Sequence, residues 1–305
     1  MDKKTLGVLA LIFTAIIWGA TLPLLKTNLN QIPPLTIGFV RFLIAAVLAV
    51  SFSEVNNLKI KDIFHIGVFA IFGITLNTGL LLVGLQKTTA VDATLIMTLS
   101  PVITSSLAVV LLSERINTGH FSGIIAAFLG SFLYVVFPHL GGSGLNFDLS
   151  GDLLVLAAVL SGSIYVLGSK KLFETYKPAT IAAVSFLVGM VSFFPGALLE
   201  YVHNSVWVEQ ISWYNIVSLL FLGVFSSFAA YFCLEWGLTI VEVHVNSAIS
   251  YLSPLVSVVV ATAFLGETLN SAFVPSTLLI VVGIFLVTKH RPNLHPHFHK
   301  RTHRI

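Results

Sequence analysis

Charged residues are scarce in this chain. Only 10% of its 305 residues are Asp, Glu, Lys or Arg, whereas 56% are hydrophobic, and the mean hydropathy is +0.95. A typical soluble domain carries about 25% charged residues. The composition therefore excludes an ordinary soluble domain and predicts a polytopic membrane protein.

Cysteine is nearly absent as well, because Cys233 is the only one and falls in a hydrophobic run. A single chain can then form neither a disulfide nor a cysteine metal site. The sequence lacks H-E-x-x-H and G-x-S-x-G motifs, and Lys87 stands too far from Gly84 for a phosphate-binding loop. We therefore expect no enzyme, no cofactor and no metal site. The basic residues are scattered between apolar runs, which argues against nucleic acid as a partner.

Apolar stretches long enough to span a bilayer dominate the sequence. They lie at residues 5–25, 34–52, 63–85, 91–113, 119–137, 151–169, 179–199, 213–238, 243–265 and 271–288. We expect an all-α membrane protein with ten transmembrane helices. If both termini are cytoplasmic, Lys26 and Lys87 are the only Lys or Arg residues outside, as the positive-inside rule favours. This predicts a multi-pass protein of the cell inner (plasma) membrane.

The two halves of the chain repeat one pattern. A shift of 153 residues places Pro101 on Pro254, and a shift of 144 places Phe42 on Phe186. Because each copy holds five spans, an odd number, the second copy must enter the membrane upside down. We expect a first five-helix repeat at 1–145, an inverted second repeat at 146–290, and a basic, His-rich cytoplasmic tail at 291–305.

A proline lies in the middle of one span in each copy. A proline inside a helix frees the carbonyl group four residues earlier, here that of Met97 and of Ser250. Neighbouring helices can satisfy such a carbonyl group by packing. Broken helices at matching positions of two repeats are also typical of a transporter's binding site near the bilayer midplane.

The pattern resembles the EamA family of the drug/metabolite transporter superfamily. The resemblance rests on Trp18-Gly19, on Arg41-Phe42, and on a proline-centred helix ending in glutamate in each half. It implies that the first, third, fourth, sixth, eighth and ninth helices surround a central cavity. Members often show tryptophan where this chain has Gly162, so the resemblance implies an asymmetric cavity with Trp18 on one side and Tyr165 on the other.

Hydroxyl and aromatic side chains recur on the helix faces that would line this cavity. Those before each proline follow the i, i+4 spacing of one helix face. The candidate substrate-binding residues are Thr14, Trp18, Asn77, Thr94, Thr98, Tyr165, Tyr231, Ser247, Ser250 and Tyr251. An interfacial anchor or a packing residue is the alternative role for Trp18.

Two ionisable side chains fall within spans, and with Pro101 and Pro254 they form the candidate coupling or gating set. Arg41 can reach the outer headgroups, hold a structural hydrogen-bond network, or bind a substrate carboxylate. Glu235 is a cation contact, a proton site, or the inner interfacial end of a helix. These alternatives stay open at the level of sequence.

The sequence favours a secondary transporter, most plausibly an exporter, that moves small metabolites such as amino acids by alternating access. Its partners would be a small-molecule substrate, the lipid bilayer and, if transport is coupled, protons. A carrier of nucleotide- or lipid-linked sugars should offer several basic cavity residues, and only Arg41 is available. A membrane enzyme should show convergent acid, base or metal ligands; an assembly subunit without transport activity is a further alternative.

A stripe of small residues between Gly119 and Gly130 indicates close helix packing, either within the chain or in a homodimer. The protein is thus a monomer or a homodimer by sequence. For the histidines of the tail we prefer contact with anionic lipid over metal binding, because their spacing matches no defined site.

Overall fold

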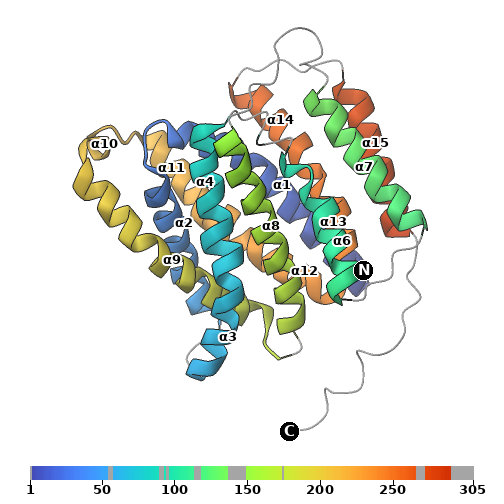
Figure 1. Ribbon diagram of the computed structural model, residues 1–305, viewed down its shortest axis with the longest axis horizontal. Helices are drawn as coiled ribbons and strands as arrows, with labels where there is room; N and C mark the ends of the chain where they lie inside the picture. Colours follow the sequence, from blue (N-terminus) through green and yellow to red (C-terminus); the bar gives the residue numbers. More distant parts are fainter. Residues whose placement is uncertain are drawn as a thin grey trace.

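The computed structural model describes residues 2–53, 58–88, 93, 96–112, 118–136, 149–173, 175–265 and 272–289. All regular elements within these ranges are helices (Figure 1), as the sequence predicts. Six helical rods are long and apolar enough to cross a membrane: Lys3–Leu29, Pro34–Ser51, Ile60–Lys87, Ser150–Leu172, Pro178–His203 and Trp213–Ile240. The all-helical, multi-pass character of the chain is thereby confirmed.

The first half of the chain folds into α1 (Lys3–Leu29), α2 (Pro34–Ser51), α3 (Ile60–Ala70), η2 (Ile71–Leu76), α4 (Asn77–Lys87), α6 (Ser100–Leu112) and α7 (Thr118–Val136). α3, the π-helix η2 and α4 follow one another without a break. Capping residues and proline determine where these helices begin. The Asp2 carboxylate accepts a hydrogen bond from the Thr5 amide ahead of α1, and Pro34 occupies the first turn of α2.

The second half folds into α8 (Leu149–Leu172), α9 (Pro178–His203), α10 (Val206–Glu209), α11 (Trp213–Phe221), η4 (Leu222–Ala229), α12 (Ala230–Ile240), α13 (Val243–Ser250), α14 (Leu252–Leu265) and α15 (Phe273–Lys289). Here α11, the π-helix η4 and α12 form one continuous rod. The apolar span expected over 243–265 consists of two helices, because Tyr251 forms a turn between α13 and α14.

Two helix pairs form the opposite ends of the molecule, α2 with α9 and α7 with α15 (Figure 1). The small-residue stripe of α7 packs within the chain. A Cβ atom added to Gly123 would lie 2.7 Å from the carbonyl oxygen of Gly283, and one added to Gly130 would lie 2.7 Å from that of Ser276. Small residues thus let α7 and α15 approach closely.

Most of the remaining helices lie between these end pairs. Among them, α1 of the first half and α8 of the second half make equivalent contacts. α1 packs against α12 and α14, and its counterpart α8 packs against α4 and α6. Lys26 Nζ donates to the carbonyl oxygen of Leu85 at 3.1 Å, and Lys170 Nζ donates to that of Leu238 at 2.8 Å. The two lysines are 144 residues apart and the two leucines 153, which are the offsets that relate the halves of the sequence.

The outer surface exposes many large apolar side chains, whereas the interior contains both apolar and polar residues. Val191, Leu199 and Phe285 are 65%, 67% and 56% exposed, as expected of side chains that face lipid. Buried Phe42 stacks on buried Phe186 with 6.3 Å between ring centroids, so two equivalent residues of the repeats meet in the core. Polar residues of the interior gather near the centre, where the candidate site lies.

Candidate functional site

Both repeats carry a π-helix at the same place. Shifting η2 by 153 residues gives 224–229, which falls inside η4 at 222–229. A π-helix breaks the i→i+4 pattern and often marks a functional site. The residues that follow η2 and η4, including Asn77 and Tyr231, line the central cavity. Sequence reasoning missed this feature.

Side chains from neighbouring helices bind the carbonyl groups of the π-helices. Tyr231 Oη donates to the carbonyl oxygen of Gly73 at 3.4 Å, and Trp18 Nε1 donates to that of Ser226 at 3.1 Å. Each bond joins one half of the chain to the other. The irregular backbone is therefore stabilised by tertiary contacts, as a bilayer interior without water requires.

The two proline-bearing segments are interrupted at matching positions. Tyr251 forms a turn three residues before Pro254, and Thr98 forms a turn three residues before Pro101. α14 and α6 begin directly after these turns, and their first residues line the cavity. A helix start carries a partial positive charge and a helix end a partial negative charge, and α13 ends directly before α14 begins, so the interruption at Tyr251 brings helix ends of both signs to the cavity.

The central cavity has a volume of about 260 Å³. Its walls come from α1, α2, η2, α4, α6, α8, η4, α12, α13 and α14. The structure brings eleven of the fourteen candidate residues together here: Trp18, Arg41, Asn77, Thr98, Pro101, Tyr165, Tyr231, Ser247, Ser250, Tyr251 and Pro254. Their arrangement around one cavity is the geometry that a binding site requires.

Two candidates lie outside the cavity lining. The Thr14 hydroxyl group lies 3.0 Å from the carbonyl oxygen of Ala10 and 3.1 Å from that of Ala230, so it can donate to either and joins α1 to α12. Thr14 does not line the cavity. Glu235 is 0% exposed and lies outside the lining, which differs from the expected position at a cavity mouth. Thr94 falls outside the described residues, as do Glu114, Glu267 and the tail.

Glu235 is nonetheless linked to the cavity. Its Oε1 accepts a hydrogen bond from Ser169 Oγ at 3.1 Å, and its carboxyl group interacts with Tyr165, which lines the cavity. Oε2 has no hydrogen-bond partner among the described residues. A carboxyl group thus stands directly behind an aromatic residue of the cavity wall.

Arg41 is a buried cation of the cavity wall and is only 5% exposed. Its Nε donates to Ser227 Oγ and its Nη2 donates to Ser226 Oγ, both at 3.3 Å, while Cζ lies 5.6 Å from the centre of the Phe42 ring. Within the described ranges no carboxylate pairs with Arg41. A buried charge held only by neutral groups is costly, so an anionic ligand would be favoured beside it.

Two residues of the cavity wall have buried hydroxyl groups without a described partner. Tyr251 and Ser247 are 1% and 2% exposed, and neither hydroxyl group has a hydrogen-bond partner in the part of the chain that the structure describes. By contrast, Ser250 Oγ already donates to the carbonyl oxygen of Asn246 at 2.9 Å. A buried hydroxyl group without a partner is unfavourable unless a ligand satisfies it.

The cavity is asymmetric, as the family resemblance implies. Trp18 packs edge-on against Tyr231 with 5.3 Å between ring centroids. At the equivalent position of the second repeat, a Cβ atom on Gly162 would come within 2.7 Å of Asn77 Nδ2. Asn77 therefore takes the space beside Gly162, and its Nδ2 donates to the carbonyl oxygen of Ala158 at 2.7 Å.

Sequence reasoning missed several polar residues of the cavity wall, among them Thr104, Ser226 and Asn246. Thr21 Oγ1 donates to Ser226 Oγ at 2.8 Å, and Thr104 Oγ1 lies 2.8 Å from Ser163 Oγ. Thr104, Ser226 and Asn246 each adjoin another polar residue within an apolar span, and such a polar group is the signal that identifies them in retrospect.

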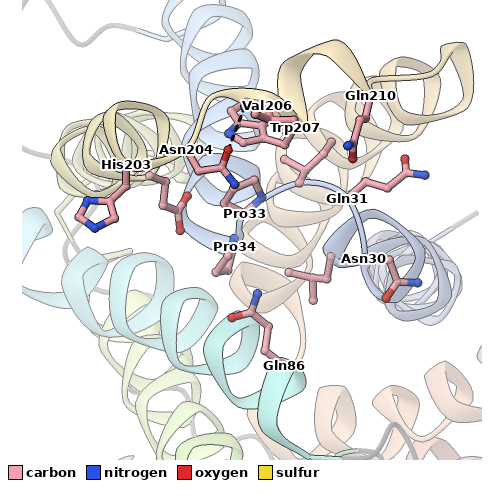
Figure 2. A pocket seen from close by; sticks show the side chains of 13 residues that line it. Asn30, Gln31, Pro33, Pro34, Gln86, His203, Asn204, Val206, Trp207 and Gln210 are labelled. Atoms are coloured by element: carbon pink, nitrogen blue, oxygen red, sulfur yellow. Dashed lines mark hydrogen bonds between the residues drawn. The ribbon is translucent and has the colours of Figure 1, made fainter.

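A second pocket, of about 460 Å³, lies among the segments that join α1 to α2 and α9 to α11 (Figure 2). Asn30, Gln31, Gln86, Asn204 and Gln210 surround it with amide groups. Glu200 also lines it, but its carboxylate caps α2 by accepting hydrogen bonds from two backbone amides.

An apolar cluster lies between the two pockets. Leu25 lines the central cavity, whereas Leu29, Ile32 and Trp207 line the second pocket, and all four belong to one packed cluster. Hydrophobic side chains therefore lie between the central cavity and the second pocket.

Comparison with known proteins bears on what such a cavity does. The sequence profile of the EamA-like transporter family matches the chain twice, over residues 5–136 and 149–289. A chain of known crystal structure superposes with a TM-score of 0.75 over 92% of this chain and 95% of that chain. Because the two are only 19% identical, this likeness supports the fold alone.

Curated relatives match over nearly their whole length. An Archaeoglobus fulgidus protein named "uncharacterized transporter" is 26% identical, with 93% of this chain and 99% of that protein covered. A Salmonella typhimurium protein named "probable amino-acid metabolite efflux pump" is 27% identical, covering 94% and 95%. A Streptantibioticus cattleyicolor protein named "probable terminal-alkyne amino-acid exporter" is 25% identical, also covering 94% and 95%.

Proposed function

Because the chain belongs to the EamA-like transporter family, we propose that it exports small metabolites such as amino acids by alternating access through the central cavity. The names of two relatives favour amino acids or their derivatives as substrates. Pockets for drug-sized ligands are usually about 300–1,000 Å³, so a cavity of about 260 Å³ suits a smaller molecule.

One observation carries the proposal. Ser247 and Tyr251 line a central cavity beside a helix interruption that recurs in the other repeat, and their hydroxyl groups have no partner among the described residues. A purely structural role would leave two buried hydroxyl groups unsatisfied, which is unfavourable in an apolar interior. A substrate with donor or acceptor groups would satisfy both.

Alternating access requires two related halves. We therefore place the chain in the inner membrane as ten membrane-spanning helices, arranged as two inverted five-helix repeats with both termini in the cytoplasm. The double match of the family profile and the equivalent contacts of Lys26 and Lys170 support two related units. The odd number of spans in each unit supports the inversion.

A carrier of nucleotide- or lipid-linked sugars is disfavoured by the charge of the cavity. Such substrates carry several phosphate charges and call for several basic side chains. Among the described lining residues, Arg41 is the one basic side chain.

Counterflow in liposomes tests the function. Purified protein is reconstituted with a panel of unlabelled amino acids inside, and uptake of each labelled amino acid from outside is measured. We expect counterflow of at least one neutral amino acid. Absence of counterflow across the panel in active, correctly inserted protein would contradict amino-acid transport.

Variants of the cavity hydroxyl groups locate the site. Tyr251→Phe and Ser247→Ala remove groups that make no described hydrogen bond, so folding should be unaffected. Each should weaken the apparent substrate affinity by about 2- to 10-fold, the value of one hydrogen bond. Tyr201→Phe, at a 52% exposed tyrosine, is the matched control. Normal affinity in both cavity variants would show that the site lies elsewhere.

A further inference from the structure

The structure assigns the part of the cavity wall around Arg41 to the binding of a substrate carboxylate. The protein therefore selects its substrates by their carboxylate group and does not require their amino group. This inference rests on the proposed transport function and specifies its substrate class: small monocarboxylates, with or without an α-amino group, and not cations.

The first step is the charge of the cavity. Among the described lining residues Arg41 is the one side chain with a formal charge, and none is Asp or Glu. The carboxyl group of Glu235 does not supply the missing charge, because it lies outside the lining and accepts the Ser169 hydroxyl group. The lining therefore offers a charged partner for an anionic group and no charged partner for an ammonium group.

The second step is the hydrogen-bonding capacity of Arg41. A guanidinium group has five N–H donors, which suit a carboxylate bidentately. Its hydrogen bonds within the described structure run from Nε and Nη2 to two serine hydroxyl groups, and both are long, at 3.3 Å. Nη1 has no partner among the described residues and remains available to a ligand.

The third step is the backbone. α6 and α14 both begin at the cavity, with Pro101 and Pro254 in their first turns. Because α13 ends at Ser250, directly before α14, the partial charges of the two helix ends largely offset each other there, and Arg41 is the main positive charge of the cavity. Ser247 and Tyr251 also line the cavity, and their hydroxyl groups have no hydrogen-bond partner among the described residues.

Three matched ligands test the inference in the wild-type protein. Leucine carries both groups, its 2-hydroxy acid analogue lacks the amino group, and leucinamide lacks the carboxylate. Each competes for counterflow of a labelled neutral amino acid, and each is tested for thermal stabilisation of the purified protein. We expect the hydroxy acid to compete within about 3-fold of leucine and leucinamide to be at least 10-fold weaker.

Variants of Arg41 tie the preference to this residue. Arg41→Gln removes a buried charge without stranding a paired acid, so the protein should fold. Loss of the charged hydrogen bonds should weaken the binding of leucine and of the hydroxy acid by about 10- to 100-fold, and should leave the binding of leucinamide unchanged. Arg41→Lys keeps the charge but loses the planar guanidinium group. Its affinity for leucine and the hydroxy acid should lie between that of the wild-type protein and that of Arg41→Gln.

The outcomes separate the two proposals. Equal competition by leucinamide, or a carboxylate preference that survives Arg41→Gln, overturns the assignment even if transport is observed. Carboxylate-dependent stabilisation without counterflow supports the assignment and contradicts the transport function. If Arg41→Gln does not fold, the comparison of the three ligands on the wild-type protein decides alone.

Discussion

Glu235 is a carboxyl group held in the interior of the protein, with Ser169 as its described hydrogen-bond partner and Tyr165 between it and the central cavity. Its counterpart in the first repeat is Leu82, which is also buried but apolar. A buried ionisable side chain that occurs in only one of the two repeats is a candidate for energy coupling.

The prediction for Glu235→Gln concerns proton coupling. The amide keeps the shape of the side chain but cannot take up and release a proton. If Glu235 couples transport to protons, the variant should lose accumulation driven by a pH gradient and keep substrate exchange, which needs no net proton movement. Both are measured in reconstituted vesicles.

Glu209→Gln, at an exposed position of α10, is the matched control for this experiment. Full accumulation driven by a pH gradient in Glu235→Gln would rule out Glu235 as the coupling group. The protein would then be an uncoupled facilitator or would use another residue.

Sequence reasoning recovered most cavity residues because helical spacing places hydroxyl groups on one face, as with Thr98, Ser247 and Tyr251. It could not exclude Thr14, because a threonine can donate its hydroxyl group to the backbone of an adjacent helix as easily as to a substrate. It could not place Glu235 either, since its contact with Ser169 of α8 is a tertiary interaction.

The π-helices η2 and η4 are the elements that set the shape of the cavity. Gly73 in η2 packs against Tyr165 so closely that a Cβ atom on Gly73 would lie 2.0 Å from the Tyr165 ring. The carbonyl group of the same residue accepts the Tyr231 hydroxyl group. The position therefore fixes two aromatic residues of the cavity wall at once.

We expect Gly73→Ala to displace Tyr165 and to cost about 1–3 kcal/mol of stability, as overpacked sites do. Thermal unfolding in detergent and counterflow measure the two effects. Gly79→Ala on the same rod is the control, because its added Cβ atom would meet Phe193 at an ordinary 3.5 Å. It should keep or slightly raise stability, since alanine favours helix. Wild-type behaviour of Gly73→Ala would show that this packing is not needed.

The helix interruptions and the π-helices differ in how far sequence reveals them. Pro101 and Pro254 cannot donate a backbone hydrogen bond, so the local sequence identifies the irregularity. The π-helices contain no such residue, and their freed carbonyl groups bind Trp18 and Tyr231 from distant parts of the chain. Only the tertiary structure shows these contacts.

At the scale of the whole molecule, α9 tests the orientation of the protein. Its 26 residues correspond to about 39 Å, enough to cross a bilayer. Lys177 precedes the helix and His203 ends it, and both side chains are exposed. The proposed topology places Lys177 in the cytoplasm and His203 outside.

Cysteine labelling checks this placement after Cys233 is replaced. In sealed right-side-out vesicles, an impermeant maleimide should label His203→Cys at once, and Lys177→Cys only after the membrane is permeabilised. Labelling of position 177 from outside would overturn the topology and the inverted repeat with it.

The end pairs α2 with α9 and α7 with α15 have a consequence for the origin of the chain. Both interfaces join a helix to its own counterpart, and Phe42 meets Phe186 in one of them. A gene encoding a single five-helix unit, inserted in both orientations, would give a product able to build the same two interfaces from identical copies. Fusion of two such genes would leave these contacts unchanged, while allowing Trp18 and Gly162 to diverge into the unequal walls of one substrate site.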